Sequence, residues 1–169
     1  MVPQVCLAYT NGYAQTQLIT LFRLPSHVSL ESAALLEPLS VAIHATRRAA
    51  VEQGDTAIVF GAGTVGLLTA AMAKMSGATT VVIVDVDHGR IEYALSNGFA
   101  HEGFVVPSRK GTGEALGQFD TAKELAEDVM QVASGDDVDF EGADVTFDCT
   151  GKEICMQAGL FVSNSFTTC

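Results

Sequence analysis

The hydrophobic positions of this 169-residue chain form short apolar runs that alternate with longer amphipathic or alanine-rich stretches. Four runs rich in β-branched or aromatic residues are typical of buried strands, and they cover residues 56–60, 80–84, 103–106 and 143–148. Each is followed by a stretch that predicts a helix, at residues 67–76, 88–96, 121–133 and 152–161. This alternation predicts an α/β fold with a parallel, doubly wound sheet and right-handed crossovers.

The segment before the first of these strands has a different pattern. Residues 11–28 mix short apolar runs with polar breaks and are interpreted as strand fragments. Ser29 suits a helix N-cap, and residues 33–50 favour a helix in which Pro38 starts or kinks a second segment. Two loops are expected later in the chain, a polar, glycine-rich one at 108–119 and an acidic one at 134–142.

Composition and charge narrow the possible partners. Hydrophobic residues make up 48% of the chain and charged residues 17%, which indicates a globular protein. Of the net charge of −11, eleven acids and the single base Lys123 place −10 between Glu114 and Asp148. No basic patch is present to neutralise phosphates, so nucleic acid and anionic membranes are not expected as partners. The acidic block lacks the ligand spacing of an EF-hand, and we interpret it as a solvated surface loop.

Location in the cell is inferred from two further patterns. Residues 56–73 carry no charge, but their glycines and strand-like first third favour a buried strand–turn–helix over a membrane span. No basic segment followed by an apolar one opens the chain, so no secretory signal is visible and a soluble cytoplasmic protein is expected.

The cysteines and histidines do not form a recognisable site. The four cysteines form no C-x-x-C pair, and the four histidines have no metal-ligand spacing such as H-E-x-x-H. We therefore expect free thiols and no metal site within this chain.

The most informative motif is Gly61-Ala62-Gly63-Thr64-Val65-Gly66, which lies between the first strand and its helix. Gly61 is expected to allow the tight turn, Gly63 to let the backbone approach a pyrophosphate, and Gly66 to let the helix pack near the sheet. The N–H groups and the positive dipole end of the helix would then face the phosphates. A glycine-rich turn that binds nothing is the alternative.

Asp85 follows the second strand, 19 residues after Gly66, and completes a dinucleotide-binding fingerprint. Its carboxylate can accept hydrogen bonds from both hydroxyls of an adenosine ribose. A 2′-phosphate at that place would meet a negative charge, so the sequence favours NAD over NADP.

Several segments in series resemble the zinc-dependent medium-chain dehydrogenases, and most closely their sorbitol (polyol) dehydrogenase branch. The resemblance covers about two thirds of the chain, and the segments that carry it lie at 24–25, 36–45, 47–48, 59–66, 73–78, 82–85, 144–151 and 155–159. The resemblance implies a Rossmann domain, NAD as cofactor, zinc in the full-length family, a polyol or alcohol substrate and usually a homo-oligomer. It also implies hydride transfer to nicotinamide from an alcohol whose oxygen is polarised by zinc.

Site residues follow from the resemblance position by position. Glu37 stands where the branch has a carboxylate beside zinc and substrate, and a charge at a helix start is its alternative. Val65 is the turn residue whose backbone meets the cofactor, and Asp85 is the ribose-binding acid. Arg90 matches a guanidinium beside the adenosine, or else is a surface arginine. Thr150 and Gly151 would line the cofactor crevice.

The chain also departs from the family pattern. No G-H-E segment or structural-zinc cysteines are present, residues 161–169 differ from the usual turn into a fifth strand, and the acidic loop is longer than usual. We therefore expect an incomplete Rossmann domain of about four strands at 51–169, a remnant of the catalytic domain at 1–50, and no activity of this chain alone. A non-catalytic truncated isoform and a Rossmann methyltransferase remain alternatives, whereas the absence of Y-x-x-x-K disfavours a short-chain dehydrogenase.

Overall fold

The computed structural model describes residues 24–107, 115–135 and 140–164. By its internal contacts the chain divides into two compact units, Met1–Glu37 and Pro38–Cys169, and each is described by itself. In the first unit, the Ser29 side chain accepts a hydrogen bond from the Ser32 N–H and caps the short helix α1 (Leu30–Ala33), as predicted. Of the strand fragments predicted at 11–28, residues 11–23 lie outside the described residues. Residues 24–28 contain a turn, closed by the Val28 N–H on the Pro25 carbonyl, so the strand prediction is wrong there.

The helix predicted at 33–50 is two helices, because α1 ends at Ala33 and α2 runs over Leu36–Arg48. Pro38 is the third residue of α2 and lies in its first turn. N–H groups in the first turn of a helix have no intrahelical acceptor, so the missing N–H of proline costs no hydrogen bond there. The chain leaves the helical conformation by Ala50, which has a φ of 52°.

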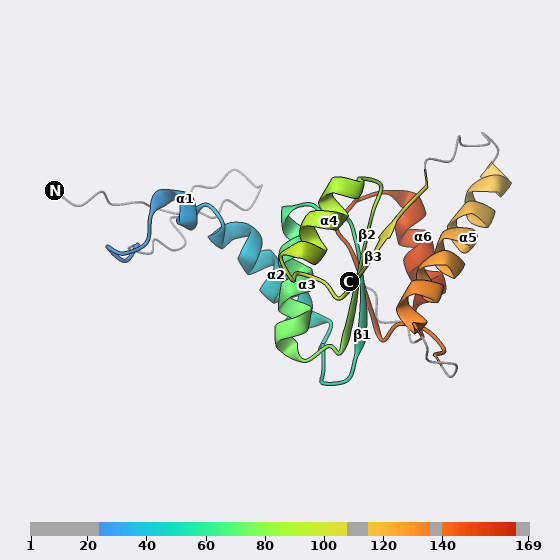
Figure 1. The fold of residues 1–169 in the computed structure, drawn as a ribbon, viewed down its shortest axis with the longest axis horizontal. Helices are drawn as coiled ribbons and strands as arrows, with labels where there is room; N and C mark the ends of the chain where they lie inside the picture. Colours follow the sequence, from blue (N-terminus) through green and yellow to red (C-terminus); the bar gives the residue numbers. More distant parts are fainter. Residues whose placement is uncertain (1–23, 108–114, 136–139, 165–169) are drawn as a thin grey trace, which may run out of the picture. The chain divides into compact units, whose positions relative to one another are not determined.

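The second unit contains the predicted parallel sheet (Figure 1). Its strands are β1 (Thr56–Phe60), β2 (Thr80–Asp85), β3 (Glu102–Val105) and β4 (Val145–Asp148), in the order β3-β2-β1-β4. All three pairings are parallel. This order equals the first four positions of the six-stranded dinucleotide-binding sheet, so the predicted fold class is confirmed.

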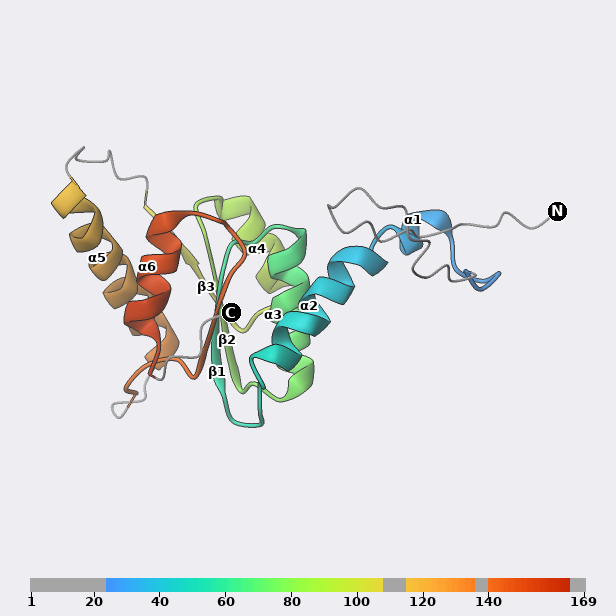
Figure 2. The same cartoon turned by 180° about the vertical axis from the view of Figure 1, so that it is seen from behind.

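Helices cover both faces of the sheet (Figure 2). Helices α3 (Thr64–Ser76) and α4 (His88–Ser96) pack on one face, and α5 (Ala115–Ser134) and α6 (Glu153–Val162) pack on the other. Alternate residues of β1 serve the two layers: Ala57 and Val59 contact the first pair of helices, while Ile58 and Phe60 contact the second. The inner residues of the two central strands, 57–59 of β1 and 81–84 of β2, are therefore apolar, as in sheets that are buried on both faces.

Several predicted boundaries are wrong by a few residues. Helix α3 begins at Thr64 rather than 67, and α5 begins at Ala115 rather than 121, so the end of the predicted loop 108–119 is helical. Strand β3 lies one residue earlier than predicted. Strand β4 begins at Val145, while Ala143 forms a separate parallel bridge with Ser163. Helix α6 is shifted by one residue, with Lys152 as its N-cap.

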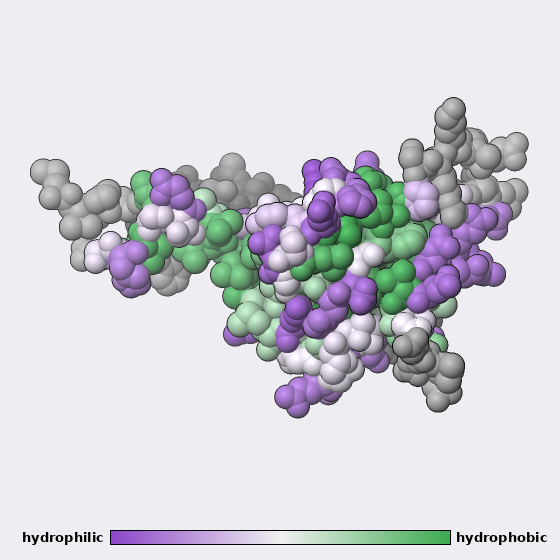
Figure 3. Space-filling view, in the orientation of Figure 1, coloured by the Kyte–Doolittle hydropathy of each residue, from purple (hydrophilic) through white to green (hydrophobic). Residues whose placement is uncertain are grey.

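Polar side chains gather over α5 on the face shown in Figure 3, which agrees with the acidic character of this part of the chain. Of the predicted acidic loop, Ser134 is the last residue of α5, and residues 136–139 lie outside the described ranges. Among the helices that the structure describes, none combines the length and the apolar character needed to cross a membrane.

Candidate functional site

The turn between β1 and α3 requires glycine at its first position. Gly61 has a φ of +99°, a conformation that side chains rarely adopt, and its N–H donates to the Val84 carbonyl at 2.6 Å. A Cβ built on Gly61 would lie 2.9 Å from Cγ2 of Thr150. The turn is thus confined between β2 and the segment that follows β4.

Gly66 closes the turn from its other end. A Cβ at this position would overlap the carbonyl oxygen of Gly61, whereas the Cβ of Cys149 after β4 would be at an ordinary 3.6 Å. The sequence predicted that a Cβ here would hold the helix away from the sheet, and the main obstacle is the carbonyl of Gly61, the first residue after β1. The turn folds back so tightly that its own first carbonyl fills the space of a side chain.

Gly63 leaves the mouth of the turn open. Gly63 is the N-cap of α3 and has no side chain that could make a cap hydrogen bond. No other described heavy atom lies within 4 Å of a Cβ built there. The first bond of the helix runs from the Leu67 N–H to the Gly63 carbonyl, at 2.9 Å. The N–H groups of Thr64, Val65 and Gly66, all in the described part of the chain, therefore have no acceptor inside the helix. This helix end has both the room and the polarity for a phosphate.

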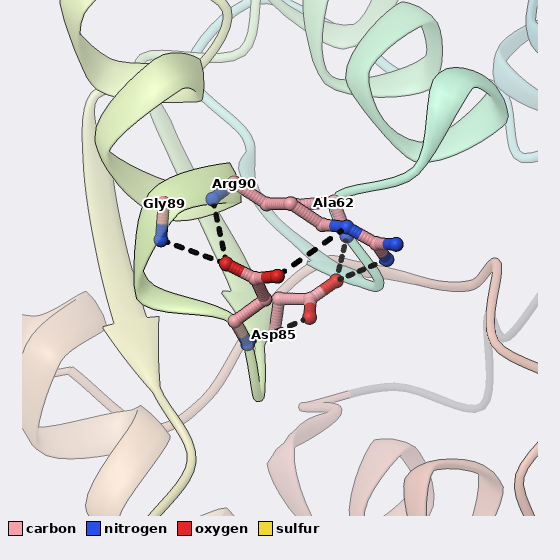
Figure 4. Close-up of polar contacts among 5 residues, drawn as sticks. Ala62, Asp85, Gly89 and Arg90 are labelled. Carbon is pink, nitrogen blue, oxygen red and sulfur yellow. Dashed lines mark hydrogen bonds and ion pairs between the residues drawn. The ribbon is translucent and has the colours of Figure 1, made fainter.

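Asp85 ties this turn to the end of β2 (Figure 4). Its side chain is 7% exposed, and its Oδ2 accepts a hydrogen bond from the Ala62 N–H at 2.7 Å. Its Oδ1 accepts from the Asp87 N–H at 3.0 Å. Each oxygen retains a further lone pair, so the carboxylate can still accept from hydroxyls of a ligand. The predicted place of Asp85 is confirmed, but its contact with Ala62 was not predicted.

Arg90 extends from α4 over this carboxylate, as Figure 4 shows. Its Nη1 lies 3.9 Å from Oδ2 of Asp85, and its Nε lies 3.9 Å from Oδ2 of Asp87. Asp87 also caps α4, because its Oδ1 accepts from the N–H groups of Gly89 and Arg90 at 2.8 and 3.2 Å. Sequence reasoning missed Asp87, although an acid directly before a helix start is a recognisable N-cap signal.

Thr150 and Gly151 lie where β4 ends beside β1, next to the glycine turn. Oδ1 of Asp148 accepts from the Thr150 N–H at 2.9 Å and from its hydroxyl at 2.6 Å. Gly151 has a φ of +64°, and no described atom beyond its chain neighbours lies within 4 Å of the place of a Cβ. The structure therefore brings Thr150 and Gly151 to the same edge of the sheet as the turn. Asp148, which orients Thr150 through these two hydrogen bonds, was not among the predicted site residues.

Two cysteine thiols lie behind this edge. Burial raises the pKa of the Cys149 thiol, with the Thr69 hydroxyl opposing the shift and the Asp148 carboxylate adding to it. Burial is also the main cause of the raised pKa of the Cys155 thiol. Both groups are therefore held as neutral thiols, which are poor nucleophiles and poor metal ligands.

Glu37, the remaining predicted site residue, lies in the first turn of α2 and is the last residue of the first unit. The glycine turn belongs to the second unit, and each unit is described by itself. Within the described ranges, no group of three or more His, Cys, Asp or Glu side chains has an arrangement that would hold a metal ion. The residues described do not fit the zinc that the resemblance implies.

Comparisons with known proteins agree with this geometry. The model of the zinc-binding dehydrogenase family matches residues 64–165. D-xylulose reductase of Saccharomyces cerevisiae is 37% identical over 150 residues, which are 89% of this chain and 38% of that protein. Sorbitol dehydrogenase 1 of the same yeast is 38% identical over 140 residues, or 83% of this chain and 35% of the relative. The chain thus spans little more than a third of the length of these curated relatives.

A solved structure adds a match in three dimensions. The chain superposes on 2R,3R-butanediol dehydrogenase from Bacillus subtilis with a TM-score of 0.58 and 31% identity, covering 85% of this chain and 35% of the other. The family match spans more than half of the chain and includes α3, β2 and β4 of the site. The chain belongs to the zinc-binding dehydrogenase family.

Proposed function

We propose that this chain forms the NAD-binding part of an oxidoreductase that transfers hydride between NAD and a polyol or secondary alcohol. The observation that carries the proposal is the hydrogen bond from the Ala62 N–H to Asp85, which holds this carboxylate, the proposed ribose ligand, beside an open helix N-terminus. The proposed substrate class is supported by the relatives, which are a D-xylulose reductase and a sorbitol dehydrogenase.

The residues of the turn divide the proposed binding between them. The pyrophosphate would lie at Gly63 and the first N–H groups of α3, from Thr64 to Gly66, with Val65 presenting its backbone. The two hydroxyls of the adenosine ribose would donate to Asp85, which keeps lone pairs for them. Thr150 and Gly151 would line the nicotinamide side of the crevice. When bound, NAD would accept the hydride, and the residues of this chain would bind and orient the NAD molecule.

The proposal leaves the catalytic half to residues outside this site. Glu37 is proposed to stand near the substrate, on the strength of its position in the family pattern. The residues described do not form a zinc site, so we predict no turnover of sorbitol, xylitol or simple alcohols by this chain alone, even with zinc added. The proposal includes a cytoplasmic location, a homo-oligomeric assembly and no nucleic-acid or membrane partner; the strongly acidic composition supports the last point.

The proposal is tested by titrating the purified chain with NAD and with NADP in a calorimeter. We expect NAD to bind more tightly and Asp85→Asn to weaken its binding, because an amide nitrogen would replace one of the two accepting oxygens. Glu92→Gln, on the exposed side of α4, is the matched control and should bind NAD as the wild type does. Equal affinity for both dinucleotides would refute the ribose assignment, and tighter binding of S-adenosylmethionine than of NAD would favour a methyltransferase.

A further inference from the structure

We propose that Asp87 is a second residue that selects NAD over NADP, acting through Arg90. The inference rests on the proposed function, because it concerns the same adenosine site. Asp85 repels a 2′-phosphate directly. Asp87 acts indirectly. It pairs with the Arg90 guanidinium, as Asp85 also does, so the positive charge that would bind the phosphate is already neutralised.

The geometry of the cap fixes the direction of the Asp87 carboxylate. Oδ1 is held by the N–H groups of Gly89 and Arg90, at 2.8 and 3.2 Å. Its other oxygen, Oδ2, lies 3.9 Å from Nε of Arg90. A side chain anchored at two points cannot turn away without losing the cap of α4. The second charge is therefore held in place beside the arginine.

The charges around Arg90 explain the effect on selectivity. Its guanidinium lies between two carboxylates, with Nη1 3.9 Å from Asp85 and Nε 3.9 Å from Asp87. Arginine next to the ribose is the usual means of accommodating a 2′-phosphate. Here the local sum of these three charges is −1, so removing Asp85 alone leaves an arginine that is still neutralised. We infer that both acids must be removed before Arg90 can serve a phosphate.

Asp87 can be tested separately from its capping role, because asparagine caps a helix about as well as aspartate. Asp87→Asn therefore removes the charge and keeps the cap. Asp85→Ser, Asp87→Asn and the double variant are compared with the wild type for the dissociation constants of NAD and NADP, measured at low and high salt. Far-ultraviolet circular dichroism and urea unfolding verify that each variant is folded, and Glu92→Gln serves as the control on the same helix.

We expect Asp85→Ser to improve the NADP-to-NAD affinity ratio and the double variant to improve it further by about tenfold. This factor follows from the attraction between the freed positive charge of Arg90 and a doubly charged phosphate roughly 6 Å away in water. Adding Arg90→Gln to the double variant should abolish the second gain, and high salt should reduce it.

Two failures can be told apart. If the wild type binds NAD but the double variant has the same ratio as Asp85→Ser, Asp87 only caps α4 and this inference is wrong. It is equally wrong if Arg90→Gln leaves the gain intact. If the folded wild type binds neither dinucleotide, the proposed function itself fails.

Discussion

Replacement of Gly66 by alanine tests the central geometric claim about the turn. The added Cβ would overlap the Gly61 carbonyl oxygen, which is backbone and cannot rotate away. Gly61 is itself held, because its N–H bonds to Val84 at 2.6 Å and its other side faces Thr150. The turn and the start of α3 must therefore move apart, and overpacking of this kind costs about 1–3 kcal/mol.

A smaller term opposes this loss. Alanine stabilises a helix interior by about 0.5–1 kcal/mol relative to glycine. We expect Gly66→Ala to lower the free energy of unfolding by about 1 kcal/mol at the midpoints of the two ranges, and by up to about 2.5 kcal/mol at their limits. Urea unfolding followed by circular dichroism measures it: the midpoint should fall at an unchanged m-value. NAD affinity should fall as well, because the N–H groups that would face the phosphates are displaced.

Gly63→Ala is the matched control, the same substitution three residues earlier. Gly63 has φ −79° and ψ −176°, which alanine adopts readily, and a Cβ there meets no other described atom within 4 Å. Stability should change by less than about 1 kcal/mol, the range of N-cap effects. NAD affinity should nevertheless drop, since the Cβ occupies the proposed phosphate space. If Gly66→Ala is as stable as the wild type, or Gly63→Ala is destabilised equally, the reasoning about the turn is refuted.

Two further predictions concern protonation. Nδ1 of His101 accepts from the Val81 N–H at 2.9 Å, and partial desolvation of this imidazole, together with the nearby Lys74 charge, lowers its pKa. The contribution of neutral His101 to the free energy of unfolding should be complete above the pKa of histidine in the unfolded chain, about 6.5. It should be lost as the pH falls from there through the lower pKa of His101 in the folded chain. His101→Asn should therefore flatten the loss of urea midpoint between pH 7.5 and 5.5, and an unchanged slope would contradict this. Burial also raises the pKa of Cys149, so iodoacetamide should label it far more slowly in the native chain than in urea, as followed by peptide mass spectrometry. Equal labelling rates would show that the thiol is not protected.

Elements with local stop signals were predicted correctly from the sequence. Strand β1 has the predicted bounds Thr56–Phe60 because charged and glycine residues flank an apolar run. Helix α4 has the predicted bounds His88–Ser96, between the Asp87 cap and Asn97. Helix α3 ends where Gly77 adopts a φ of +116°, the left-handed conformation that made it a predicted stop.

Predictions failed where the deciding contact is distant or where propensities compete. Helix α5 starts at Ala115, before the predicted start, because helix-forming residues outweigh the loop signal of Gly117. Strand β4 is shorter than its apolar run, since Ala143 is hydrogen-bonded to Val162 and Asn164 instead of continuing the strand. The bond from Ala62 to Asp85 joins residues 23 apart in the sequence. No local pattern encodes such a pairing; it appears only when β1 and β2 lie side by side.

The long-range hydrogen bond between Ala62 and Asp85 links the stability of the glycine turn to the binding of the ribose. Asp85 was predicted as a group that binds ribose, yet it also holds the Ala62 and Asp87 N–H groups. Variants at Asp85 should therefore lose turn stability and nucleotide affinity together. In an Asp85→Ser background, Asp87→Asn should change the NADP-to-NAD affinity ratio while leaving the free energy of unfolding nearly unchanged, because asparagine keeps the cap. If Asp85 variants lost affinity with no loss of stability, the carboxylate would have only a binding role, and the bond to Ala62 would contribute little to the turn.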